Sequence, residues 1–88
     1  MYKVKFTKSV IKQFSKLQAD AYGQVFSGII SLLSDPFSSA IDVTKLTDFE
    51  GYRLRIGDYR VLYTINTDLE EIIIKAIVRR KDAYKKKK

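Results

Sequence analysis

The sequence predicts an α+β domain in which a two-helix antiparallel hairpin packs on one face of a mainly antiparallel four-stranded sheet, in the order β-α-α-β-β-β. Apolar residues recur at helical spacing in two successive segments, and segments with strand-like alternation lie before and after them. The chain has 88 residues, of which 45% are hydrophobic, and this is enough for one modest core. We therefore expect a single domain over residues 1–88.

The N-terminal third of the chain reads as a strand followed by two helices. Residues 2–6 alternate apolar side chains with lysine, and Thr7 is placed to cap the helix that follows. Asp20 is a second N-cap candidate, and Asp35-Pro36 stops the second helix. Both apolar stripes are expected to be core: Val10, Ile11, Phe14 and Leu17 in the first helix, and Tyr22, Val25, Phe26, Ile29, Ile30 and Leu33 in the second.

The rest of the chain supplies the other strands. Residues 37–50 are rich in Ser, Thr and Asp and indicate a loop, with room for a short strand at 43–46. A hairpin follows at 52–63, and after a turn at 66–69 the segment 71–78 is nearly continuous in Ile, which favours an interior strand. The first strand must pair with one of the last three, and periodicity leaves open which one.

Three arginines in the hairpin segment are the most informative feature of the chain. If Gly57-Asp58 forms a two-residue turn, Arg55 faces Arg60 and Arg53 faces Leu62. Side chains alternate across a sheet, so all three arginines emerge on one face, opposite the face that the helices cover. Like charges directly opposite each other destabilise a sheet. The pattern therefore indicates that this face holds something strongly anionic.

Composition excludes several classes of site. The chain has no histidine and no cysteine, so His-based acid/base pairs, catalytic triads and thiolate chemistry are impossible, and a metal site could use oxygen ligands alone. We expect neither metal nor cofactor. The net charge of +7 favours a polyanionic partner. No signal peptide or membrane span is evident, which predicts a soluble cytoplasmic protein.

Several segments of the sequence resemble a known protein family. Lys45-Leu46, the segment from Gly51 to Tyr63, the Ile-rich strand and the ending Arg80-Lys81-Asp82-Ala83-Tyr84 resemble the RelE/ParE toxin superfamily, the toxin halves of toxin–antitoxin pairs. The resemblance covers the whole chain in length and element order. The RelE branch cuts messenger RNA in the decoding site of the ribosome, whereas the ParE branch poisons DNA gyrase. The terminal tyrosine, which ParE toxins typically lack, favours the RelE branch.

The resemblance implies roles for five residues. It implies that Arg60, Arg80 and Tyr84 are catalytic and that Arg53 and Arg55 bind RNA phosphates. Lys81, next to Arg80, is a further candidate for binding RNA phosphate. The implied reaction is metal-independent attack of a ribose 2′-hydroxyl on the adjacent phosphate. Some relatives have lysine where Arg53 and Arg55 stand, and many have histidine where Arg79 stands. Arginine hardly ever releases its proton, so the base remains open between Tyr84 and the lysines at 81 and 85–88.

The sequence leaves two alternative functions open, and the resemblance implies two partners. The same fold could serve a gyrase inhibitor, and the same basic face could serve a nucleic-acid-binding module without catalysis. A toxin implies a cognate antitoxin protein, acidic or amphipathic, that covers the arginines or displaces the C-terminal segment. It also implies messenger RNA in the ribosomal A site, with inhibited translation and arrested growth as the result. The basic tail at 85–88 is expected to be disordered or to touch RNA nonspecifically.

Overall fold

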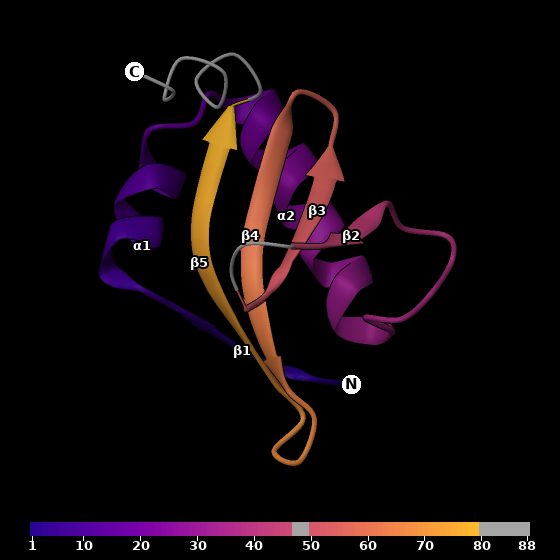
Figure 1. Ribbon diagram of the computed structural model, residues 1–88. Helices are drawn as coiled ribbons and strands as arrows, with labels where there is room; N and C mark the ends of the chain where they lie inside the picture. The colour runs from indigo at the N-terminus through magenta and orange to yellow at the C-terminus, as the bar shows by residue number, and fades with distance from the viewer. Residues whose placement is uncertain (47–49, 80–88) are drawn as a thin grey trace.

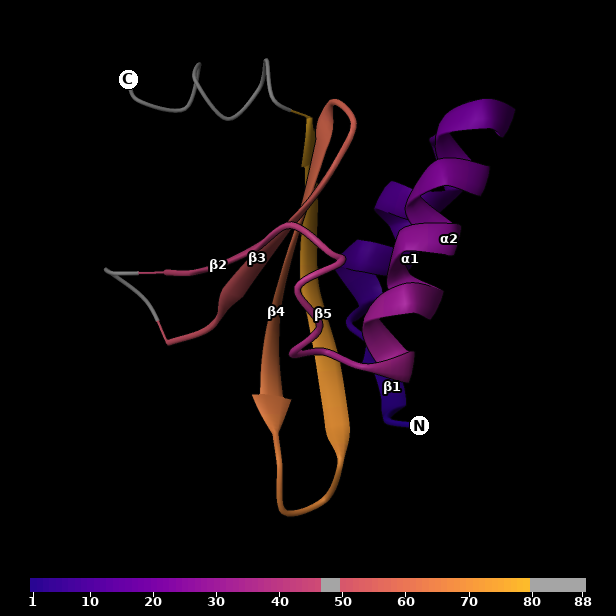
Figure 2. The ribbon, with the colours of Figure 1, turned by 90° about the vertical axis from the view of Figure 1, so that its right-hand side faces the viewer.

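A computed structural model of the chain describes residues 1–46 and 50–79. Both helices lie on one face of a single five-stranded sheet, whose strand order is β1-β5-β4-β3-β2 (Figures 1 and 2). The elements are β1 Lys3–Phe6, α1 Lys8–Ser15, α2 Ala19–Ser34, β2 Val43–Lys45, β3 Tyr52–Ile56, β4 Tyr59–Asn66 and β5 Glu71–Arg79. The predicted class is confirmed. Neither α1 nor α2 has the length and apolar character that crossing a bilayer requires. The proposed tail at 85–88 lies outside the described residues.

The sheet has one strand more than the four that were predicted. The extra strand is β2, which pairs antiparallel with β3 so that Val43 lies opposite Leu54. It is only three residues long, too short for alternation to stand out from the surrounding polar loop. At the other edge β1 pairs with β5 in parallel, from Lys3 opposite Glu71 to Phe6 opposite Ile74. The Ile-rich β5 is therefore an interior strand, as predicted.

The two helices begin differently. The Thr7 hydroxyl accepts a hydrogen bond from the Val10 amide at 3.3 Å, so the predicted cap of α1 is confirmed. The predicted cap of α2 is wrong, because Gln18 occupies the N-cap position and Asp20 lies within the first turn. A carboxylate in the first turn still stabilises the helix through the macrodipole, so Asp20 supports the start of α2 from two residues after the N-cap. Asp35 ends α2, as predicted.

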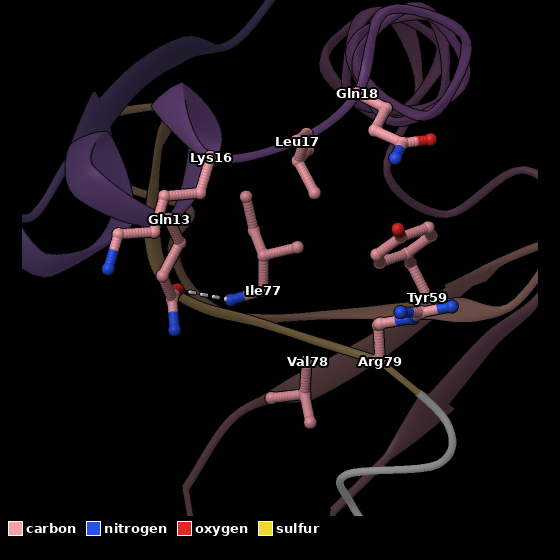
Figure 3. A pocket seen from close by; sticks show the side chains of 8 residues that line it. All are labelled: Gln13, Lys16, Leu17, Gln18, Tyr59, Ile77, Val78 and Arg79. Atoms are coloured by element: carbon pink, nitrogen blue, oxygen red, sulfur yellow. Dashed lines mark hydrogen bonds between the residues drawn. The ribbon is translucent and has the colours of Figure 1, made fainter.

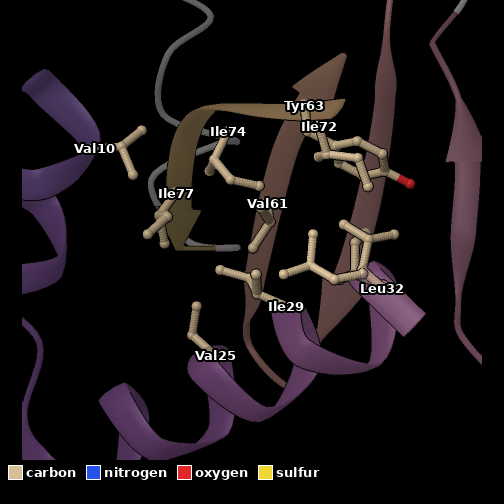
Figure 4. Packing of buried hydrophobic residues seen from close by; sticks show 11 residues of the cluster. Val10, Val25, Ile29, Leu32, Val61, Tyr63, Ile72, Ile74 and Ile77 are labelled. Carbon is tan, nitrogen blue, oxygen red and sulfur yellow. The ribbon is translucent and has the colours of Figure 1, made fainter. Parts of the chain in front are cut away.

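The core lies between the helices and the sheet (Figure 4). Its buried members are Val10, Val25, Ile29, Leu32, Leu33, Leu54, Val61, Tyr63, Ile72, Ile74 and Ile77. The prediction that both helical stripes are core in full is wrong for four residues that are exposed: Ile11, Tyr22, Phe26 and Ile30. A helix that rests on one sheet buries only the side that faces it, so the outer part of a wide apolar stripe stays in water.

A glycine sets how closely α2 lies against the sheet. Gly28 of α2 packs against Ile56 of β3, and a Cβ at position 28 would collide with the Ile56 side chain. The glycine therefore allows the helix to approach the hairpin closely.

Strand β5 contains a bulge at Lys75. Lys75 faces no residue of β4, because Leu62 faces Ala76 while Tyr63 faces Ile74.

The bulge changes which residues of β5 face the helices. Before it, Ile72 and Ile74 are buried, and after it Ile77 is buried. The inward positions thus shift from even to odd numbers, and Arg79 follows Ile77 onto the helical side of the sheet.

Candidate functional site

The β3–β4 hairpin places the arginines as the sequence predicts. Gly57, the first residue of the turn, has a φ of 56°, in the left-handed region that glycine adopts at little cost. The register puts Arg55 opposite Arg60 and Arg53 opposite Leu62. The predicted register is therefore confirmed.

All three arginines lie on the sheet face that points away from the helices. Their neighbours along the strands, Leu54, Val61 and Tyr63, are buried against the helical layer, so the alternating arginines point to the other side. Figure 2 shows both helices on one side of the sheet and none on the other. We call the surface formed by Arg53, Arg55 and Arg60 the arginine face.

The three side chains of the arginine face differ in how far they are exposed to water. Arg55 is exposed, Arg53 and Arg60 are half-buried, and the Nε atom of Arg60 is buried. Arg60 is flanked by Arg55 on β3 and by Val78 on β5. Within the described part of the chain, neither Arg53 nor Arg55 forms a salt bridge with a carboxylate. Guanidinium groups held this way suit bidentate binding of phosphate oxygens.

A hollow of about 490 Å³ continues this surface toward the far end of β4. Thr64 and Asn66, which alternate in phase with Arg60, line it together with Lys45 and Lys75. Sequence reasoning missed both lysines as candidate contacts. The available signal was Lys75 itself, the one charged residue inside the run from Ile72 to Val78. These lysines add positive charge beside the arginine face, and Glu50 in the same lining offsets part of it.

The tyrosines of the hairpin are packing residues. Tyr63 is buried and stacks on Tyr52 with ring centroids 5.7 Å apart, and Tyr52 and Tyr59 are half-buried. Burial raises the pKa of the Tyr63 phenol well above its usual value of 10, and the neighbouring Tyr52 raises it further. Tyr63 therefore stays protonated and cannot accept a proton from a substrate.

The C-terminal candidates lie largely beyond the described residues. Arg80, Lys81 and Tyr84 fall outside them. Arg79 is the last residue described, and its guanidinium carbon lies 5.9 Å from the centroid of the Tyr59 ring, on the helical side of the sheet. Arg79 is thus separate from the arginine face. Residues 1–46 and 50–79 contain no cluster of three acidic side chains that could hold a metal ion.

Sequence comparisons identify relatives over nearly the whole chain. Residues 4–84 match the family model described as the ParE toxin of the type II toxin–antitoxin system parDE. The candidate toxin RelE1 of Methanocaldococcus jannaschii is 34% identical over 86 residues, which are 96% of each chain.

Solved structures share the fold. RelE in the RelE–RelB complex of the archaeon Pyrococcus horikoshii matches with a TM-score of 0.78 and 32% identity, over 90% of this chain and 94% of the other. The isolated RelE toxin of E. coli matches with a TM-score of 0.75 over 97% of both chains, at 18% identity. At that identity the E. coli structure supports the fold alone. The RelB–RelE complex of Methanococcus jannaschii matches with a TM-score of 0.75 and 20% identity, over 94% of this chain and 98% of the other.

Proposed function

Because the chain belongs to the RelE/ParE family of toxins from toxin–antitoxin systems, we propose that it is a ribosome-dependent endoribonuclease that cuts messenger RNA in the decoding site and so inhibits translation. The observation that carries this proposal is the arginine face. Arg55 and Arg60 are directly opposed, with Arg53 beside them, on a sheet face that neither helix covers. Such an arrangement is costly without an anion, and a phosphodiester supplies one.

The proposed reaction is transesterification within the RNA. The 2′-oxygen forms a bond to the adjacent phosphorus while the bond from phosphorus to the 5′-oxygen breaks. The 2′-hydroxyl proton passes to a base, and a proton reaches the departing 5′-oxygen. The products are a 2′,3′-cyclic phosphate and a free 5′-hydroxyl. Negative charge grows on the phosphoryl oxygens, and preorganised cations stabilise it most effectively.

The residues divide into two groups in this proposal. Arg60, Arg80 and Tyr84 act on the reacting phosphate, and Arg53, Arg55 and Lys81 hold the flanking RNA. An arginine side chain has a pKa above about 12 and stays charged, so it stabilises the transition state and does not serve as the base. The base is then to be sought in Tyr84 or in a lysine.

The proposed partners follow from the family. The Pyrococcus horikoshii and Methanococcus jannaschii relatives were solved as complexes with RelB antitoxins. We propose that this chain acts in the cytoplasm and is neutralised there by its own antitoxin. The net charge of +7 would attract an acidic segment of such a protein.

Primer extension on a translated message tests the proposal. A reporter message is translated with purified ribosomes in the presence of the protein, and its 5′ ends are mapped. We expect new 5′ ends inside the reading frame at codons that occupied the decoding site, and none when ribosomes are omitted. Intact message at full ribosome occupancy would refute the proposal.

The matching family model is described as a ParE toxin, which makes gyrase inhibition the second candidate. A supercoiling assay separates the two functions, because a ribonuclease leaves gyrase unaffected. Inhibited supercoiling together with intact message would assign this chain to the second function. RNA binding without either activity would indicate that the chain is a nucleic-acid-binding module without catalysis.

A further inference from the structure

A second basic surface lies on α1, on the other side of the sheet from the arginine face. Lys8 and Lys12 of α1 and its C-cap residue Lys16 follow one another at intervals of four residues, and all three are exposed. Residues four apart lie on the same side of a helix, so the three ammonium groups form a row about 12 Å long. Val10, the buried residue of α1, is two positions from both Lys8 and Lys12 and thus on the opposite side of the helix. We call Lys8, Lys12 and Lys16 the lysine row.

The lysine row is electrostatically unfavourable for the folded chain alone. Like charges four residues apart destabilise a helix, and Lys8 in the first turn opposes the helix macrodipole, although the macrodipole favours Lys12 in the last turn and Lys16 at the C-cap. The first nineteen residues contain five lysines and no acidic residue. Lys5 pairs with Glu71 at 3.3 Å, but in residues 1–46 and 50–79 no carboxylate lies within salt-bridge distance of the lysine row. Among the described residues the row therefore presents positive charge without a carboxylate partner, as Arg53 and Arg55 do.

A hollow of about 500 Å³ opens where the lysine row ends. Figure 3 shows Gln13 and Lys16 on one side of it, Tyr59 and Arg79 on the other, and the apolar side chains of Leu17 and Ile77 between them. Among residues 1–46 and 50–79, the side chains that line this hollow include no acidic one. It combines the Arg79 guanidinium with the Tyr59 ring and an apolar floor, and Lys16 lies at its rim with the ammonium group turned outward (Figure 3). Such a hollow suits a phosphate joined to a sugar or a base.

The spacing of these groups favours a polymeric anion over a small one. A single phosphate could occupy the hollow but would leave Lys12, about one turn away, and Lys8, about two turns away, without a ligand. An RNA backbone presents a series of phosphates and could contact the row and the hollow together. Exposed ammonium groups on a convex helix suit such backbone contacts, which carry no base specificity.

We propose that the lysine row and the Tyr59–Arg79 hollow form a second RNA-backbone site, distinct from the arginine face and separated from it by the sheet. The choice of RNA as the ligand rests on the proposed function. The site itself binds RNA and cleaves none. While the arginine face holds the strand to be cut, the second site holds RNA on the helical side, either another part of the message or ribosomal RNA.

Salt-dependent binding tests this proposal without any cleavage. The probes are message-free small ribosomal subunits and a single-stranded 2′-O-methyl RNA, which lacks the nucleophile. We expect Lys8→Gln/Lys12→Gln/Lys16→Gln to lower the slope of log K against log salt by about 2–3 for at least one probe, since each lost phosphate contact reduces it by roughly one. A lower slope with the small ribosomal subunits alone would identify ribosomal RNA as the ligand. A lower slope with the single-stranded RNA would identify the message as the ligand.

Matched variants separate a site from a general charge effect. Two single glutamine variants, Lys12→Gln and Lys3→Gln, reach the same net charge, 7 − 1 = +6, and Lys3→Gln should keep more of the slope. Lys8→Arg/Lys12→Arg/Lys16→Arg should bind as the wild type does, which would exclude misfolding of α1 as the cause. Equal losses in the two single glutamine variants, or an unchanged slope in the lysine-row variant with both probes, would overturn the site. So would unchanged RNA binding with lost affinity for poly-glutamate, which would assign the row to an acidic protein.

Because no step of this test needs cleavage, it can succeed or fail independently of the proposed reaction. A protein that binds RNA through the lysine row and cuts no message would refute the proposed function alone. A protein that cuts message with an unchanged salt slope in the lysine-row variant would refute the second site alone.

Discussion

The side chains of Arg55 and Arg60 project from directly opposed positions on neighbouring strands, so their positive charges repel each other and destabilise the sheet. Arg53 adds a third positive charge two residues before Arg55 on the same face. In residues 1–46 and 50–79 no salt bridge relieves Arg53 or Arg55. A site that binds an anion has this property, because the charge that aids binding destabilises the free protein.

Replacing Arg55 should therefore have opposite effects on stability and on activity. We expect Arg55→Gln to raise the free energy of unfolding by about 0.2–1 kcal/mol, because it removes a directly opposed like charge. The same variant should cut ribosome-bound message more slowly than the wild type. Urea unfolding and a cleavage assay measure the two effects, with Lys3→Gln, an exposed edge-strand change, as the control. A less stable Arg55→Gln protein would contradict this account of the face.

Tyr63 offers a second test at the residue scale. Its hydroxyl is buried, and no hydrogen-bond partner for it is present among the described residues. An unpaired buried donor costs free energy, so Tyr63→Phe should leave the free energy of unfolding unchanged or raise it by about 1 kcal/mol. Urea unfolding at neutral pH measures it. A loss of more than about 1 kcal/mol would show that the hydroxyl has a partner.

The raised pKa of Tyr63 also predicts how stability depends on pH. In the unfolded chain this phenol ionises near pH 10, whereas in the folded protein burial keeps it protonated to a higher pH. The contribution of the Tyr63 phenol to the free energy of unfolding is complete below pH 10. Above pH 10 it is lost by about 1.4 kcal/mol per pH unit. The wild type should thus lose stability relative to Tyr63→Phe as the pH rises above 10. A difference between the two proteins that does not change with pH would contradict this.

At the scale of the elements, α1 protects an edge of the sheet that β1 leaves open. β1 pairs with β5 only as far as Ile74. Beyond that point the Ile77 amide donates to the Gln13 side-chain oxygen of α1 at 2.8 Å. The glutamine replaces a strand partner and fixes the end of β5 that leads to the C-terminal candidates.

Removing this acceptor should loosen the end of β5. We expect Gln13→Ala to lower the free energy of unfolding by about 1–3 kcal/mol, because it leaves a partly buried amide unpaired, and Gln13→Glu to keep most of the stability. Amide hydrogen exchange at Ile77 should become faster in Gln13→Ala. Unchanged exchange at Ile77 would show that this hydrogen bond does not hold the strand.

The elements also show what the sequence could predict. The register of the arginine hairpin follows from strict alternation around Gly57-Asp58, and both signals are local. The sequence left room for a short strand at 43–46, where β2 lies, but its pairing with β3 and the bulge at Lys75 depend on neighbouring strands, which periodicity within one segment does not reveal. The exposure of Phe26 likewise depends on how much of α2 the sheet can cover. For the site, three arginines could be placed, whereas the contributions of Lys45 and Lys75 needed the folded sheet.

At the scale of the whole molecule, the sheet separates two positive surfaces. The arginine face lies on one side, and the lysine row with the Tyr59–Arg79 hollow lies on the helical side. A net charge of +7 on 88 residues favours rapid, salt-sensitive encounter with RNA. In the proposed function the first surface does the chemistry, and the second helps to hold the protein on its target.

The rate of message cleavage by an Arg60 variant tests the central claim most directly. Single-turnover cleavage on programmed ribosomes would be measured for the wild type, Arg60→Gln and the control Lys3→Gln, with unfolding curves to confirm that each variant is folded. The account predicts that Arg60→Gln cuts roughly 10²–10³ times more slowly, by analogy with the loss of one oxyanion-stabilising donor, while Lys3→Gln cuts at the wild-type rate. A folded Arg60→Gln protein that cuts as fast as the control would contradict it.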